Sequence, residues 1–122
     1  MKLFSPLAAT LLAISTPATA RIWLWEIPFH EPLNWIYGEK LGYRIIDVFD
    51  SPLGNYTDDG WLHFVEQKCI DKLCQGLLTY KVGEHAPEYR VGVTFRGPWI
   101  YARDFERNEG IWDSHAGNMV QN

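Results

Sequence analysis

The segment from Tyr89 to Arg96 alternates apolar and polar residues more regularly than any other part of the chain, and it constrains the fold most strongly. In an extended strand the apolar side chains would share one side, and they are Tyr89, Val91, Val93 and Phe95. The opposite side would carry Arg90, Gly92, Thr94 and Arg96. We therefore expect a half-buried β-strand with one polar face.

Five further runs have the composition of strands and are bounded by residues that favour turns. They are residues 21–27, 43–50, 61–68, 76–82 and 99–105. The run 43–50 is apolar on both faces, which predicts a central strand. Residues 33–41 would form a short helical or irregular crossing. Residues 107–122 are polar apart from Trp112, which predicts a frayed tail.

About six strands with at most one short helix predict a mainly β fold. The two architectures that fit are a compact antiparallel β-sandwich and a small barrel. A chain of 122 residues, of which 47% are hydrophobic, is expected to form a single domain.

The first twenty residues have the three parts of a secretory signal peptide. Lys2 supplies positive charge, residues 7–14 are apolar, and residues 17–20 end in Ala-Thr-Ala. We expect cleavage after Ala20, which leaves residues 21–122 as the secreted, extracellular domain. The apolar run is too short to span a membrane, and no run of about 20 apolar residues follows it.

Two local features agree with export. Cys69 and Cys74 are the only cysteines, and in an oxidising compartment they would close a short disulfide loop between two strands. Asn55 begins an Asn-Tyr-Thr glycosylation sequon within the turn-rich residues 51–60.

Charge and spacing argue against several classes of function. A net charge of −4 disfavours duplex nucleic acid, because a surface that neutralises phosphates needs a basic excess. No His-Glu-x-x-His or two-histidine, one-carboxylate spacing occurs, so we expect no metal and no other cofactor. The expected species is a monomer.

The polar face of the 89–96 strand is the first candidate binding surface. Arg90, Thr94 and Arg96 could anchor a phosphate or carboxylate group, and Trp99 follows at the start of the next strand. The alternative interpretation is a solvated sheet face on which the arginines pair with neighbouring acidic residues.

A second candidate site uses the order His63, Glu84, Arg96 or Arg103, and His115 along the chain. This order resembles that of the catalytic residues in the small secreted guanyl-specific ribonucleases of fungi. The resemblance implies that a glutamate and a histidine exchange protons while an arginine neutralises the phosphate. A ribonuclease of this type would bring His63 or His115 to a Glu and an Arg in one cleft.

A third candidate function is glycan binding, in which exposed rings stack on sugar faces. The tryptophans whose full burial is least assured by their positions are Trp35, Trp61, Trp99 and Trp112. A lectin-like module would require at least two coplanar exposed rings.

Taken together, the leader, the single cysteine pair, the aromatic content and the strand pattern are similar to those of small secreted fungal effectors. The size and strand content resemble the MAX-type β-sandwich effectors and, more distantly, the ribonuclease-like effectors. The resemblance implies a non-enzymatic virulence protein that binds a host protein. An edge strand or the Arg90/Thr94/Arg96 face would be the contact surface.

Overall fold

The computed structural model describes residues 21–83 and 87–121. The expected signal peptide and Glu84 lie outside these ranges. Five strands form an antiparallel sheet, in the order β1 (Ile22–Glu26), β7 (Ile111–Gln121), β4 (Gly76–Val82), β5 (Tyr89–Phe95) and β3 (Ile45–Pro52). The expectation of a mainly β antiparallel fold is confirmed, and within the described ranges the strands form open sheets and no closed barrel.

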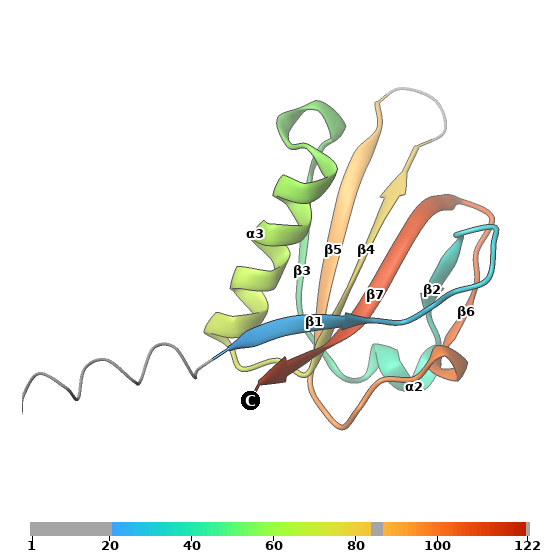
Figure 1. Cartoon of the computed structure of the whole chain (residues 1–122). Helices are drawn as coiled ribbons and strands as arrows, with labels where there is room; N and C mark the ends of the chain where they lie inside the picture. The colour runs from blue at the N-terminus through green and yellow to red at the C-terminus, as the bar shows by residue number, and fades with distance from the viewer. Residues whose placement is uncertain (1–20, 84–86, 122) are drawn as a thin grey trace, which may run out of the picture.

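A different layer covers each face of this sheet (Figure 1). The 14-residue helix α3 (Asp58–Asp71) lies across one face. The other face carries a two-stranded sheet of β2 (Trp35–Tyr37) and β6 (Phe105–Arg107), together with α2 (Glu39–Gly42). Short 3-10 turns, η1 (Leu53–Asn55) and η2 (Ala102–Asp104), connect these elements. Within the described ranges, no helix has both the length and the apolar character that crossing a bilayer requires.

The core between α3 and the sheet depends on residues spaced four apart along the helix. Trp61, Val65 and Cys69 are buried and face Leu77 of β4. Val65 fits over Gly92 of β5, where a β-carbon would come within 2.4 Å of a valine methyl group. The helix can therefore approach the sheet closely at that point.

A second core fills the space on the opposite face of the sheet. Its buried residues come from the five-stranded sheet, from the layer of α2 and β6, and from the segments that connect them. They are Ile27, Leu41, Leu78, Val93, Phe95, Ile100, Phe105 and Ala116. Asn118 supports this side from β7: its side chain bonds to both the N–H (2.8 Å) and the C=O (2.9 Å) of Ile100. These bonds fix the segment before η2 to the sheet.

Residues 61–68 form the middle of helix α3, so the prediction of a strand there was wrong. Thr57 caps the helix by accepting a hydrogen bond from the Gly60 N–H (3.0 Å), and two aspartates follow in the first turn. Trp61, Phe64 and Val65 follow the i, i+3, i+4 spacing of a helix, but the run is short and rich in residues that also favour strands.

The predicted frayed tail is also wrong. Residues 111–121 form β7, the longest strand, which pairs with β1 on one side and β4 on the other. Two of its polar residues, Ser114 and Asn118, are buried beneath neighbouring elements. The segment is polar because this strand contributes polar groups to the interior. Composition alone did not distinguish such a strand from a solvent-exposed tail.

Two other strand predictions need correction. The 43–50 run is the edge strand β3, and its two apolar faces are partly covered by α3 and by the opposite layer. The 99–105 run contains the turn η2 and only the first residue of β6. Predictions for residues 21–27, 76–82 and 89–95 were close to the observed strands.

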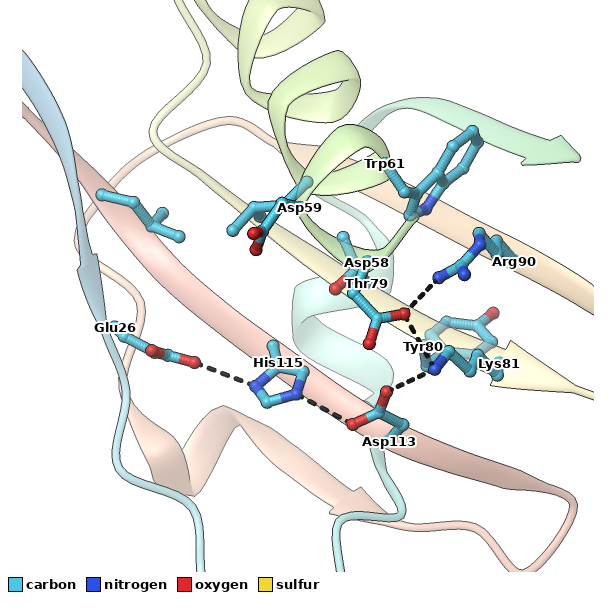
Figure 2. A pocket seen from close by; sticks show the side chains of 12 residues that line it. Glu26, Asp58, Asp59, Trp61, Thr79, Tyr80, Lys81, Arg90, Asp113 and His115 are labelled. Atoms are coloured by element: carbon cyan, nitrogen blue, oxygen red, sulfur yellow. Dashed lines mark hydrogen bonds and ion pairs between the residues drawn. The ribbon is translucent and has the colours of Figure 1, made fainter. Parts of the chain in front are cut away.

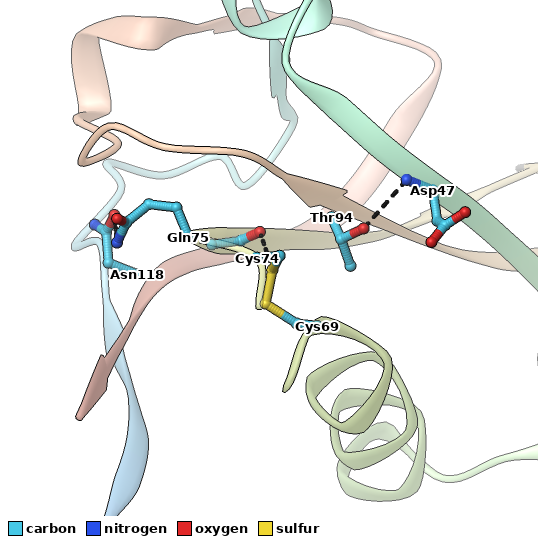
Figure 3. The surroundings of a disulfide bond; sticks show 7 residues. Asp47, Cys69, Cys74, Gln75, Thr94 and Asn118 are labelled. Atoms are coloured by element: carbon cyan, nitrogen blue, oxygen red, sulfur yellow. Dashed lines mark hydrogen bonds between the residues drawn. A yellow bond between two sulfur atoms is a disulfide. The ribbon is translucent and has the colours of Figure 1, made fainter. Parts of the chain in front are cut away.

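The disulfide between Cys69 and Cys74 is confirmed (Figure 3). It joins the last turn of α3 to the segment entering β4, with 4.9 Å between the two α-carbons. The bond therefore fixes the end of a helix to the sheet, whereas the sequence had predicted a link between two strands.

Candidate functional site

Charged side chains from four strands and one helix meet on the face of the sheet that α3 covers. The strand registers place Glu26 of β1, His115 of β7 and Lys81 of β4 on this face, with Arg90 of β5 beyond them. Asp58, the first residue of α3, points its carboxylate toward Lys81 and Arg90 (Figure 2). All five line one pocket.

These residues form a continuous chain of ionic contacts with alternating charge, which we call the ionic chain. Glu26 contacts His115 Nδ1 (2.9 Å), and the other ring nitrogen, Nε2, contacts Asp113 (3.0 Å). The second oxygen of Asp113 lies 2.7 Å from Lys81 Nζ. The ionic chain thus links the edge strand β1 to the middle of the sheet.

The ionic chain continues through the helix. Asp58 Oδ1 accepts from both Lys81 Nζ (3.0 Å) and Arg90 (2.7 Å). Arg90 also donates through Nε to the C=O of Leu53 (3.0 Å). One aspartate at the start of α3 therefore holds the helix terminus against two strands.

A β-bulge places Asp113 in the centre of the ionic chain. Between the pairs Thr79–His115 and Lys81–Trp112, one residue of β4 faces two residues of β7. Asp113 occupies the left-handed region there, with φ of 54°, which is uncommon for a residue other than glycine. Strained backbone of this kind is concentrated at functional sites.

The pocket has a volume of about 210 Å³, and its walls are of two kinds. Leu24, Leu62 and Trp61 supply apolar surface, whereas the ionic chain and Asp59 supply charge. The acidic side chains at the mouth of the pocket are exposed, whereas the basic side chains are mostly buried. The side chains of Asp58 and Glu26 are 68% and 57% exposed, but those of Lys81 and Arg90 are only 13% and 9% exposed.

Contacts within the ionic chain favour the charged forms of Asp58, Lys81, Asp113 and His115. Hydrogen bonds from Arg90 and Lys81 lower the pKa of Asp58. Burial acts to raise the pKa of Asp113 and to lower that of Lys81. Their hydrogen bonds outweigh it, so the pKa of Asp113 is lowered and that of Lys81 is raised.

The pKa of His115 is also shifted toward the charged form. Burial acts to lower the pKa of its imidazole, but the hydrogen bonds to Glu26 and Asp113 outweigh burial and raise that pKa. The ring therefore retains its proton to a higher pH than an ordinary histidine. A protonated ring can donate to both carboxylates at once.

Arg90 and Thr94 lie beneath α3, so the structure corrects the expectation of an open polar face on β5. Both are buried, and Thr94 Oγ1 accepts from the N–H of Asp47 (3.2 Å). Arg96 is exposed beyond the helix and donates to the C=O of Ile45 (3.2 Å). Trp99 lies away from these residues and packs against Trp25 of the edge strand β1, with ring centres 5.8 Å apart.

The histidines and arginines of the ribonuclease-like order are only partly brought together. His115 lines the pocket with Glu26 and Arg90, two residues outside that order. His63 is exposed on α3, and Arg103 lies over the Tyr101 ring; neither lines this pocket, nor does Arg96. The arginine that shares the pocket with His115, Arg90, is already bonded to Asp58 and to the C=O of Leu53.

The tryptophans proposed for glycan stacking occupy varied environments. Trp61 is buried and donates to the C=O of Val91 (3.2 Å). Trp35 lies between Phe29 and the guanidinium of Arg107, and the Trp112 ring lies 4.9 Å from Lys81 Nζ. The Trp25 and Trp99 rings are inclined by 48°, so this pair is not coplanar.

Two exposed tryptophan side chains lie on one face of β1. Trp23 and Trp25 are 41% and 47% exposed, and Ile22 beside them is also exposed. The N–H of Ile27 bonds to Ala116 of β7 (2.8 Å). Because backbone groups alternate along an antiparallel strand, those of Leu24 and Glu26 point away from β7 toward the open edge.

Sequence reasoning missed most of this site. Glu26, Asp58, Asp113 and Lys81 were not singled out, because their partners lie in distant elements. The Asp-Ser-His sequence at 113–115 was the only local signal, and it lay within the predicted tail. Had β7 been recognised, the alternation of strand residues would have placed His115 on a sheet face.

Family models, curated proteins and solved structures were all compared with the chain, and none matched. Within the described residues no group of three or more His, Cys, Asp or Glu side chains could hold a metal ion.

Proposed function

We propose that this is a secreted, non-enzymatic protein of the effector type, which binds a host protein by adding a strand to the open edge of β1. The observation that carries the proposal is the exposure of Trp23 and Trp25 on an edge strand whose outward backbone groups face no other strand among the described residues. Large exposed apolar side chains on such an edge favour association.

The contrast between the two edges of the sheet supports the choice of β1. The opposite edge strand, β3, carries Asp47, Asp50 and Pro52, which oppose edge-to-edge pairing. The sequence of β1 is Ile-Trp-Leu-Trp before its first charge at Glu26. Strand addition would obtain affinity from backbone hydrogen bonds and specificity from the alternating side chains.

Two sequence features agree with the proposed compartment. The disulfide suits an oxidising environment, and Asn55 is exposed at the end of η1, where a glycan could be attached. Its sequon threonine, Thr57, caps α3.

The test is a selection of peptides from an unbiased phage-displayed library on residues 21–122, followed by NMR of the labelled protein. Binding by strand addition should slow amide exchange at Leu24 and Glu26, whose N–H groups point outward. The double variant Trp23→Ser, Trp25→Ser should bind the same peptides at least about tenfold more weakly, since buried tryptophans dominate interfaces.

Tyr43→Ser is the matched control, because Tyr43 is an exposed aromatic residue outside the strands. It should bind peptides like the wild type. Peptides that bind elsewhere and leave the β1 amides unchanged would contradict the proposal.

Acid–base cleavage of RNA is the second candidate, because His115 contacts Glu26 and shares a pocket with Arg90. The position of the charges argues against RNA cleavage, because an approaching phosphate would meet the exposed carboxylates of Asp58 and Glu26 before it reached the buried cations. We expect no cleavage of single-stranded RNA above that of the His115→Ala variant. Cleavage that this variant abolishes would replace the binding proposal with an enzymatic one.

A further inference from the structure

We propose that the pocket of the ionic chain binds a lysine or arginine side chain from the strand that pairs with β1. This inference rests on the proposed function, and it specifies the chemistry of the partner. It assigns one role to two neighbouring features, the open edge of β1 and the pocket that begins at Glu26.

The strand geometry connects the two features. Leu24 and Glu26 project from β1 toward the α3 side of the sheet, and both line the pocket. A strand added to β1 would place its alternate side chains on that same side, opposite or diagonal to these two residues, about 5 Å away. A long side chain opposite Glu26 is therefore within reach of the pocket.

The charge distribution selects a cation over an anion. The basic groups of the ionic chain are already occupied: Lys81 by Asp113 and Asp58, and Arg90 by Asp58 and a backbone carbonyl. The exposed carboxylates retain acceptor capacity, because each contact in the ionic chain at Glu26 uses Oε2 and each at Asp58 uses Oδ1. Asp59 adds another carboxylate to the pocket wall.

The apolar part of the pocket fits the stem of the same side chain. Lysine and arginine bury their methylene groups against apolar surface and keep the charged end among polar groups. Leu24 and Leu62 could contact the methylene groups, while Glu26 and Asp59 accept hydrogen bonds from the ammonium or guanidinium. A metal ion would not use the apolar wall.

The register then predicts a pattern in the partner strand. The residue opposite Glu26 should be basic, and the residue two positions away, opposite Leu24, should be apolar. Residues on the other face would meet Trp23 and Trp25, so apolar or aromatic side chains are expected there. Opposite charges across neighbouring strands are favourable, whereas an acidic residue at the first position would be repelled.

The experiment uses the peptides selected on residues 21–122. In each peptide the basic residue assigned to the Glu26 position is replaced by citrulline, which keeps the shape of arginine and removes its charge. Affinity is measured by fluorescence polarisation. The arginine peptide should bind about five to ten times more tightly than the citrulline peptide.

Two substitutions in the protein should remove this preference. Glu26→Gln and Asp59→Asn together should reduce the preference for the arginine peptide over the citrulline peptide to about onefold, because the charged acceptors are removed. Asp71→Asn, at an exposed carboxylate at the far end of α3, is the matched control and should retain the preference. Circular dichroism confirms that each variant is folded.

The outcomes separate the two proposals. Equal affinity for arginine and citrulline peptides that do slow exchange at the β1 amides would overturn the pocket assignment and leave strand addition intact. Peptides that never contact β1 would overturn strand addition, and the pocket is then tested alone with agmatine as the probe. Agmatine should shift the NMR signals of Glu26 and His115, and an absence of shifts would overturn the cation site.

Discussion

His115 of β7 contacts Glu26 of β1 through Nδ1 at 2.9 Å, and this is the ion pair that joins the edge strand to the interior of the charged pocket. Because Nε2 of the same ring contacts Asp113, the imidazole holds two carboxylates from two strands together. The protonation state of one side chain is thereby linked to the packing of the β1 edge.

The stability of the fold should depend on pH through this histidine. Its folded-state pKa is raised, so its stabilising contribution is complete below the unfolded pKa, about 6.5, and is lost as pH rises through the folded value. The free energy of unfolding of His115→Gln, measured in urea from pH 5 to 8, should lack this decline. His30→Gln, at an exposed histidine, should keep the decline shown by the wild type. An identical pH profile for His115→Gln and wild type would contradict the prediction.

The close approach of α3 to the sheet predicts a specific clash. Gly92→Ala should destabilise the protein by roughly 1–3 kcal/mol, because the new methyl group would lie 2.4 Å from Val65. Adding Val65→Ala should restore part of the loss by making room, which a double-mutant cycle in urea measures. Gly54→Ala is the control, since a β-carbon there meets no atom within 4 Å. Strictly additive losses would count against this packing.

Asn118 predicts the largest effect of a single polar substitution. Asn118→Ala should cost about 2–4 kcal/mol, because it leaves both the N–H and the C=O of Ile100 without their partner in a buried region. Thermal unfolding monitored by fluorescence measures the loss. Gln121→Ala, at an exposed position of the same strand, should change stability little. A loss below about 0.5 kcal/mol for Asn118→Ala would mean that water replaces the bonds.

The disulfide should contribute modestly because it closes a short loop. Replacing both Cys69 and Cys74 by serine should cost about 2 kcal/mol on the loop-entropy scale, without unfolding the domain at 25 °C. Reduction of the wild type with dithiothreitol should give a similar loss, measured by urea unfolding. Complete unfolding after reduction would show that the bond determines the position of α3.

Local patterns accounted for part of the fold. The alternation in β5 and the apolar content of β4 are properties of neighbouring residues, and the cysteines are only five positions apart. Such features follow from short-range geometry, so the mainly β class, the strands near residues 21–27, 76–82 and 89–95, and the disulfide could be predicted from the sequence.

The identity of α3 and β7 could not be predicted in the same way. The run around Trp61 is rich in residues that also favour strands, and the packing of Val65 over Gly92 requires a helix there. The polar residues of β7 look unsuited to a core until Ile100 and Lys81 supply their partners. A single sequence does not reveal which distant groups will satisfy a buried polar side chain.

The sequence by itself therefore determined the strand-rich class and the cysteine pair, and it indicated Arg90, Thr94 and His115 as candidate functional residues. Only the tertiary structure decided that Arg90 is buried against Asp58 and that His115 lies between Glu26 and Asp113. The physical reason is that burial and charge pairing depend on contacts across long sequence separations: 89 positions divide Glu26 from His115. Helix α3 covers the face of β5 that was expected to be open, and the pocket forms where that helix begins.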